Sequence, residues 1–177
     1  MTPNLSLIDP AFVGAVGASE EFSYYFEQLD ASNEQGLDTA RSISLKELTG
    51  FTHIGEKVKT VAFYLKRTAT APSGNIYAKI YNDSAVLQAT SDPLDSATLT
   101  ESLAWKNFTN FDSTPDMETD WFVTVEAVTT GTLNYVLAGF NIPSESNLEM
   151  WLGNADSPND RGIENNACPS IKLSSMV

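Results

Sequence analysis

The chain has 177 residues, 42% of them apolar and 19% charged, which is enough to bury one hydrophobic core without disulfides or metals. It carries 23 acidic residues against 10 lysines and arginines, and its net charge of -13 argues against nucleic-acid phosphates and anionic membrane surfaces as partners. The composition therefore predicts a globular protein that binds no nucleic acid.

The beginning of the chain lacks the pattern of a secretory signal peptide. The run MTPNLSLIDPAFVGAVGASEEF has no lysine or arginine before its apolar part, and Asp9-Pro10 interrupts that part. No run approaches the roughly 18 apolar residues that a membrane helix requires. We therefore expect no signal peptide and no membrane insertion. Cys168 is the only cysteine, so no internal disulfide is expected.

Residues 1–40 differ in pattern from the rest of the chain. Phe22, Tyr24 and Phe26 alternate like a strand, and residues 31–39 are polar. Two interpretations stay open: an N-terminal arm that packs on a neighbouring subunit, or an N-terminal strand of the same sandwich. We divide the chain into an arm or extension, residues 1–40, and a β-sandwich domain, residues 41–177.

From residue 41 onward, short apolar runs are separated by turn residues, which is typical of an all-β sandwich. In the run at 57–66, Val61, Phe63 and Leu65 share one face and Tyr64 lies on the other. The sequence predicts a strand here with a buried side and an outer side.

The next run, GNIYAKIY at 74–81, has an unusual outer face. Its three apolar residues share one side, and Tyr77, Lys79 and Tyr81 share the other. Tyrosine is favoured in interfaces where one end of the side chain stays wet. This strand is therefore predicted to present a docking face, for protein first and for a glycan as the alternative. A glycan would stack on Tyr64, Tyr77 and Tyr81 if their strands are neighbours.

Two further runs alternate in the second half of the chain. In the run at 120–127, Trp121 shares a face with valines, which predicts its burial. We expect this run to form a hairpin with residues 133–140 across Gly131. In the run at 148–152, Trp151 lies opposite to the other apolar residues and is predicted to be exposed or part of an interface.

The remaining segments complete the expected sandwich. Residues 154–166 are polar and predict a loop, and residues 171–173 predict the last strand. Together the runs indicate about eight to ten antiparallel strands, which is enough for two packed sheets.

The chain offers little that favours catalysis or metal binding. His53 is the only imidazole, and no local motif selects a catalytic pair among the carboxylates. We expect no enzymatic activity and no cofactor. Calcium in a loop is the alternative, with hard oxygen ligands at Asp92, Asp95, Asp156 and Asp160, but their spacing is not that of an EF-hand loop. Turn formation is the stronger explanation for these residues.

A resemblance to a known class of domain rests on the following runs: VAFYLKR at 61–67, PSGNIYAKIY at 72–81, ATSDPLDSATL at 89–99, WKNFTNF at 105–111 and DWFVTVEAV at 120–128. In order and character they resemble the jelly-roll sandwich domains of bacterial, archaeal and viral surface proteins, which are similar to carbohydrate-binding modules. The resemblance covers residues 41 to about 140. It implies a jelly-roll fold.

A small, acidic sandwich with an arm and no export signal is similar to virion accessory proteins, such as capsid decoration or tail-associated proteins. The resemblance implies a non-enzymatic structural protein on the surface of a virion. Its partners would be other virion proteins, or further copies of itself in a homo-oligomer. The alternative is a carbohydrate-binding module or a receptor-binding adhesin that recognises surface glycans.

Overall fold

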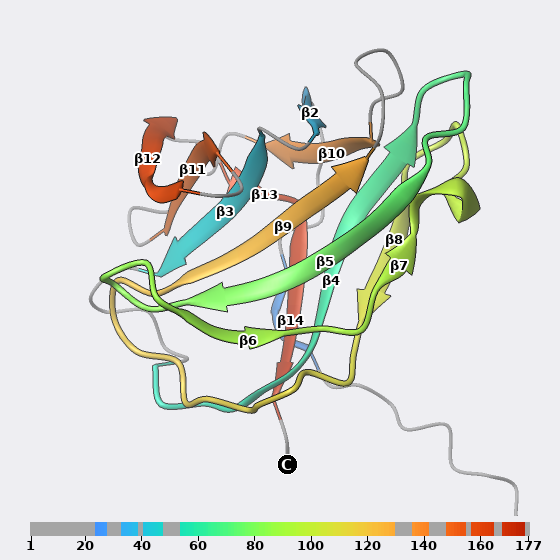
Figure 1. The fold of residues 1–177 in the computed structure, drawn as a ribbon. Coiled ribbons are helices and arrows are strands. Elements are labelled where there is room, and N and C mark those ends of the chain that lie inside the picture. The colour runs from blue at the N-terminus through green and yellow to red at the C-terminus, as the bar shows by residue number, and fades with distance from the viewer. Residues whose placement is uncertain are drawn as a thin grey trace, which may run out of the picture.

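The structure, a computed structural model, describes residues 24–27, 33–38, 41–47, 54–129, 136–141, 148–154, 157–164 and 168–175. Within these ranges it contains fourteen strands, and its only helical element is the single turn η2 (Ser96–Thr98). The strands form two antiparallel sheets (Figure 1). The predicted all-β sandwich is thereby confirmed, whereas the jelly-roll topology stays a prediction.

The first sheet is built around β4 (Val58–Arg67). One side of β4 pairs with β8 (Ala104–Phe108), and the other side pairs in succession with β14 (Ile171–Ser175) and β10 (Val136–Asn141). Outside these lie β1 (Tyr24–Glu27) on β14, and β2 (Asn33–Leu37) and β13 (Cys168–Pro169) on β10.

The second sheet has β9 (Phe122–Thr129) near its centre. On one side of β9 lie β3 (Ser42–Glu47), β11 (Leu148–Asn154) and β12 (Ser157–Glu164). On the other side β5 (Gly74–Tyr81) carries β6 (Leu87–Thr90) and the two-residue β7 (Leu94–Asp95). In Figure 1 the strands β9 and β5 run side by side across the front of β14, β5 also passes in front of β4, and β3 lies to their upper left.

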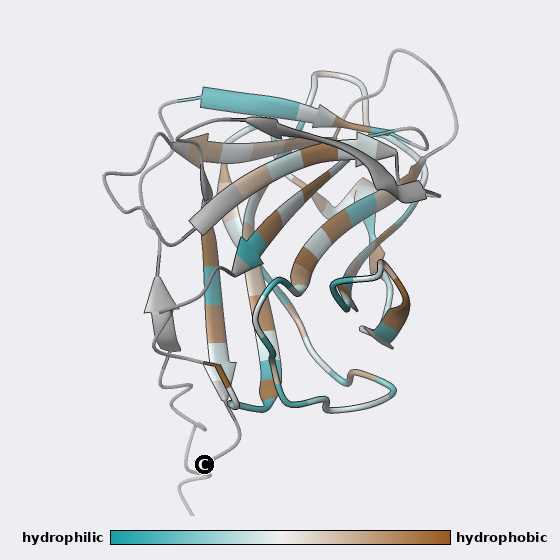
Figure 2. Cartoon of the chain, turned by 90° about the vertical axis from the view of Figure 1, so that its left-hand side faces the viewer, coloured by the Kyte–Doolittle hydropathy of each residue, from teal (hydrophilic) through white to brown (hydrophobic). Residues whose placement is uncertain are grey.

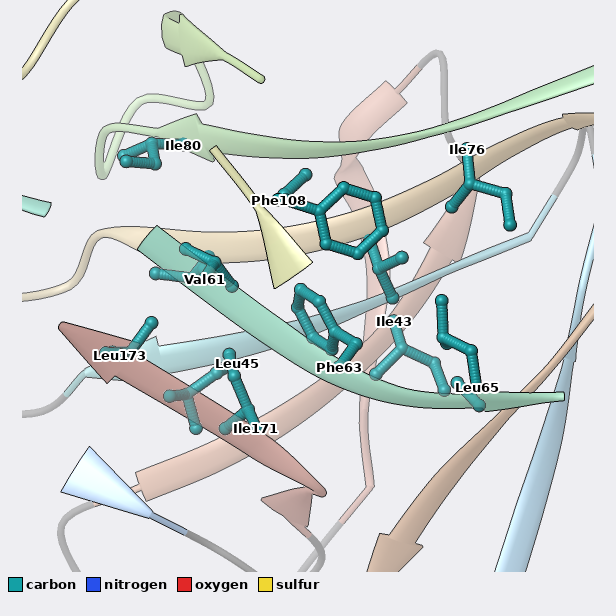
Figure 3. Close-up of a cluster of buried hydrophobic side chains, with 14 of the residues drawn as sticks. Ile43, Leu45, Val61, Phe63, Leu65, Ile76, Ile80, Phe108, Ile171 and Leu173 are labelled. Carbon is teal, nitrogen blue, oxygen red and sulfur yellow. The ribbon is translucent and has the colours of Figure 1, made fainter. Parts of the chain in front are cut away.

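The two sheets share one apolar core. Hydrophobic residues recur at every second position along the strands, as the banding in Figure 2 shows. The Phe63 and Phe108 rings meet edge to face at 6.1 Å within the first sheet. Figure 3 shows how side chains from both sheets meet between the layers, among them Val61, Phe63, Leu65, Ile171 and Leu173 of the first sheet and Ile43, Leu45, Ile76 and Ile80 of the second.

Two expectations about the later strands are wrong. β9 and β10 do not form a hairpin, because β9 pairs with β3 and β5 in the second sheet, whereas β10 pairs with β2, β4 and β13 in the first. The chain changes sheet between them. Residues 157–164, expected in a loop, form β12 on the edge strand position beside β11. Trp121, in contrast, is buried in the core as predicted.

The start of the chain contributes strands to the first sheet. β1 pairs with β14, and β2 pairs with β10 along its whole length. Leu37, at the end of β2, has a fully buried side chain. Both strands fit the interpretation in which residues before 41 belong to the same sandwich. The division of the chain at residue 40 stays a prediction, and residues 1–23 lie outside the described ranges.

Candidate functional site

The outer side of the second sheet gathers most of the predicted contact residues. In β5 the residues Tyr77, Lys79 and Tyr81 face outward, because the intervening isoleucines and alanine are fully buried on the core side. The register of β9, β3 and β11 places further outward residues beside them. We call this surface the tyrosine face and define it as Ser42, Ser44, Lys46, Tyr77, Lys79, Tyr81, Phe122, Thr124, Glu126 and Trp151.

A buried carboxylate lies at the centre of the tyrosine face. Glu126 is only 2% exposed, although it is on the outer side of the sheet. Its Oε2 lies 2.6 Å from the Lys79 ammonium, and its Oε1 accepts a hydrogen bond of 2.7 Å from the Tyr81 hydroxyl. Charge-assisted hydrogen bonds of this length are strong and directional. Glu126 therefore holds both Lys79 and Tyr81 in fixed positions.

Small hydroxyl side chains fill the strands beside this network. Ser44 and Thr124 are fully buried and their hydroxyl oxygens lie 2.8 Å apart. The Ser42 hydroxyl donates to the carbonyl of Gly153 at 3.3 Å. Thr124 and Glu126 alternate with the core-facing valines of β9, so they lie on the outer side, but their burial was not predicted, because such residues on an outer face are normally solvated.

Trp151 lies on the outer side of β11, as its alternation with the buried Met150 predicts. Its half-buried ring meets the Phe122 ring edge to face at 5.6 Å. The Lys46 ammonium lies 5.3 Å from the Trp151 ring centroid and 2.9 Å from the Asp120 carboxylate. A cation over an indole face is attracted by the ring quadrupole. Trp151 is thus part of an ordered aromatic and cationic cluster at one side of the tyrosine face.

Tyr64 does not belong to the tyrosine face. It lies in β4, on the outer side of the first sheet, so the condition for a three-tyrosine sugar platform is not met. The Tyr64 ring instead stacks on Trp105 with centroids 5.0 Å apart, and the Lys172 ammonium lies 4.7 Å from the Trp105 ring. The sequence did not predict this cluster, because it depends on the register between β4 and β8, which alternation does not specify.

Exposed apolar side chains extend the tyrosine face along β5 in both directions. Leu87, which is 47% exposed, pairs with Tyr81, and Val128, which is 53% exposed, pairs with Asn75. The exposed Asn75 amide donates to the Tyr77 hydroxyl at 3.3 Å. This part of the surface therefore combines exposed apolar side chains with the polar amide and hydroxyl groups of Asn75 and Tyr77.

Two of the candidate calcium ligands, Asp92 and Asp95, accept hydrogen bonds, and a third, Asp160, lies in β12. Asp92 accepts a hydrogen bond from the Asn110 amide at 2.8 Å, and Asp95 caps η2 by accepting from the backbone N–H of Ala97 at 2.9 Å. Asp156, the side chain of Asp160 and His53 lie outside what the structure describes. In the part that it does describe, no three histidine, cysteine or acidic residues are grouped as a metal site.

No protein-family model matches this chain, and no curated protein matches it. Within the described ranges, no helix has the length and hydrophobicity needed to cross a membrane. The function is therefore inferred from the side chains exposed on the outer surfaces of the two sheets.

Proposed function

We propose that the chain is a non-enzymatic structural protein of a virion, a capsid decoration or tail-associated protein that acts through protein–protein contacts. The tyrosine face is the docking surface, and residues 1–40 help to anchor the protein on the particle. The observation that supports this proposal best is the ion pair between the half-buried Lys79 and the buried Glu126, with the half-buried Tyr77 opposite Glu126 in the strand register.

Preorganisation favours this surface as an interface. Glu126 holds the half-buried Lys79 side chain in place in the unbound protein, so docking costs less side-chain entropy than at a surface of free rotamers. Exposed Leu87 and Val128 add apolar area to be buried. Aromatic residues with a polar end are enriched in protein interfaces.

Charge supports the same surface. The whole chain carries -13, so most contacts between copies or with acidic partners are opposed by repulsion. On the tyrosine face the two lysines are each paired with a carboxylate, Lys79 with Glu126 and Lys46 with Asp120. The formal charges of these two pairs cancel, so they add little to the repulsion between copies.

Binding to virus particles tests the proposal. Purified chain is expected to cosediment with particles that lack it, and Tyr77→Ala is expected to abolish the binding. Tyr64→Ala is the matched control, because it removes a half-buried tyrosine from the outer side of the other sheet. A wild-type chain that stays monomeric and binds neither capsid nor tail components would contradict the proposal.

The second candidate function is a carbohydrate-binding module or receptor-binding adhesin for surface glycans. The pairing of the Asn75 amide with the Tyr77 hydroxyl favours it, since sugars bind to aromatic faces with amides nearby. Against it, Tyr81 is only 6% exposed and offers no ring face to a sugar. A glycan array decides: specific binding that is lost in Tyr77→Ala would place this function above the structural one.

A further inference from the structure

β6 and β8 are edge strands of the second and first sheets, and they differ in whether their outer backbone groups form hydrogen bonds. β6 is closed by the loop that follows β8: the Asp112 N–H donates to the Thr90 carbonyl at 3.0 Å, and the Thr90 N–H donates to the Asp112 carboxylate at 2.8 Å. The Asp92 N–H donates to the Thr109 carbonyl at 3.1 Å. The Ser113 hydroxyl donates to the Gln88 carbonyl, so the Thr90 N–H and both the Thr90 and Gln88 carbonyls of β6 are already bonded.

β8 lacks such a closure among the described residues. Its ladder runs to β4 alone, from Phe108 opposite Val61 to Ala104 opposite Leu65. None of the described backbone hydrogen bonds outside that ladder involves residues 104–108. A strand paired on one side directs about half of its N–H and C=O groups away from the sheet, where they form a template for a further strand. β8 is thus an open edge.

A lysine in the middle of β8 limits what can pair with this edge. Lys106 is paired with Phe63, so it lies on the core side of β8, while Trp105 and Asn107 face outward. Two β8 strands joined antiparallel about their centres would bring Lys106 against Lys106. Like charges directly opposite each other destabilise a strand pair, and an inward-facing charge on an edge strand acts against pairing of like edges. β8 therefore disfavours its own copy as a partner.

The same lysine favours an acidic strand. Lys106 is half-buried, and no carboxylate in the described part of the chain lies within ion-pair distance of its ammonium. The chain itself has 23 acidic residues and 10 basic ones, so its own segments are complementary to this cation. Placing unlike charges opposite and like charges apart is how strand partners are discriminated.

We propose that β8 is a docking edge that accepts an extended acidic segment from a second copy of this chain as an added strand, with Lys106 as the residue that selects it. Main-chain hydrogen bonds supply affinity in such strand addition, and the side chains supply specificity. Because β8 pairs with a different segment, the contact is heterologous and builds rings or longer assemblies rather than two-fold dimers. This edge is separate from the tyrosine face and does not depend on the proposed function.

Sedimentation velocity of the purified full chain over a range of concentrations tests the proposal. The wild type is expected to associate into species larger than a dimer, and Lys106→Glu is expected to weaken this association by about ten-fold or more, since like charges at a contact cost at least that factor. Lys57→Glu is the matched control, because it changes the net charge equally at an exposed residue outside β8. It is expected to associate like the wild type.

Hydrogen exchange locates the contact. The amides of residues 104–108 are expected to exchange several-fold more slowly in the associated state than in the dilute chain, and Tyr77→Ala is expected to leave both the association and this protection unchanged. Circular dichroism verifies that each variant keeps the β-rich fold. The proposal is overturned by a monomeric wild type at every concentration, by equal association of Lys106→Glu and Lys57→Glu, or by unchanged exchange at 104–108.

Discussion

The Lys79 ammonium lies 2.6 Å from the Glu126 carboxylate on the outer side of the second sheet, where Glu126 is only 2% exposed. A buried charge is tolerated only when it is paired and its remaining lone pairs accept hydrogen bonds. The Tyr81 hydroxyl satisfies the second carboxylate oxygen at 2.7 Å. This network gives the tyrosine face its fixed geometry, and its loss should affect both stability and docking.

Glu126→Ala is expected to lower the free energy of unfolding by about 2–3 kcal/mol, somewhat less than for a fully buried pair, because the Lys79 side chain is 23% exposed. The substitution leaves the ammonium and the Tyr81 hydroxyl without their acceptor. Urea unfolding measures the change. Glu101→Ala is the control, since that exposed carboxylate pairs with Arg67 at the surface and should cost less than about 1 kcal/mol. Equal losses in the two variants would contradict the assigned role of Glu126.

Thr60→Val is expected to stabilise the protein by about 1 kcal/mol. The Thr60 hydroxyl is buried, and no described group forms a hydrogen bond with it. Removing an unsatisfied buried hydroxyl while keeping the shape of the side chain relieves its desolvation cost. Thr124→Val is the matched control: it is equally buried but bonded to Ser44, so it should destabilise. Thermal unfolding of both variants measures the sign, and a destabilised Thr60→Val would mean that the hydroxyl has a partner, such as a bound water.

Ala85→Gly is expected to raise the free energy of unfolding by about 0.5–1 kcal/mol. Ala85 has φ of 60°, in the left-handed region that costs a residue with a Cβ about 1 kcal/mol or more. Glycine removes that strain and loses part of the gain through its more flexible unfolded state. Ala97→Gly, in the η2 turn, lacks the strain and should lose stability instead. Chemical denaturation compares the two, and a loss in Ala85→Gly would contradict a strained turn at this position.

Asp112→Ala is expected to open the edge of β6. The Asp112 carboxylate accepts the Thr90 N–H, so its removal leaves that donor to solvent. We expect a stability loss of about 1 kcal/mol, which is typical of one hydrogen bond, and faster amide exchange at Thr90. Asp83→Ala, in the exposed turn before β6, is the control and should leave the exchange at Thr90 unchanged. Unaltered exchange in Asp112→Ala would show that the carboxylate does not protect this edge.

Alternation along the chain predicted the central strands, although the described residues form fourteen strands where about eight to ten were expected, and β12 forms where a loop was expected. Val61, Phe63 and Leu65 are buried on one side of β4, and Tyr77 and Lys79 face outward from β5, because a period of two fixes which side each residue takes. The two-sheet, all-β architecture follows from the repetition of such runs.

The neighbour relations between strands were not predictable in the same way. Tyr64 in β4 and Tyr77 in β5 each alternate with buried apolar residues of their own strand. The two strands nevertheless belong to different sheets, so the two tyrosines lie on opposite outer sides of the sandwich. The run at 133–140 looked like the hairpin partner of 120–127, but the chain crosses to the first sheet between them. Pairing depends on packing across the whole domain, and a local pattern carries no information about it. The burial of Glu126 was missed for the same reason, since Lys79 and Tyr81 come from another strand.

Oxidative side-chain footprinting of the chain, free and within virus particles that contain it, tests the tyrosine face most directly. Tyr77 and Trp151 lie on that face, and Ile54, an exposed residue outside both the tyrosine face and β8, is an internal reference. We predict that the modification rates of Tyr77 and Trp151 fall several-fold in the particle while that of Ile54 is unchanged. Modification of Tyr77 and Trp151 at the rates of the free chain would contradict docking through this face.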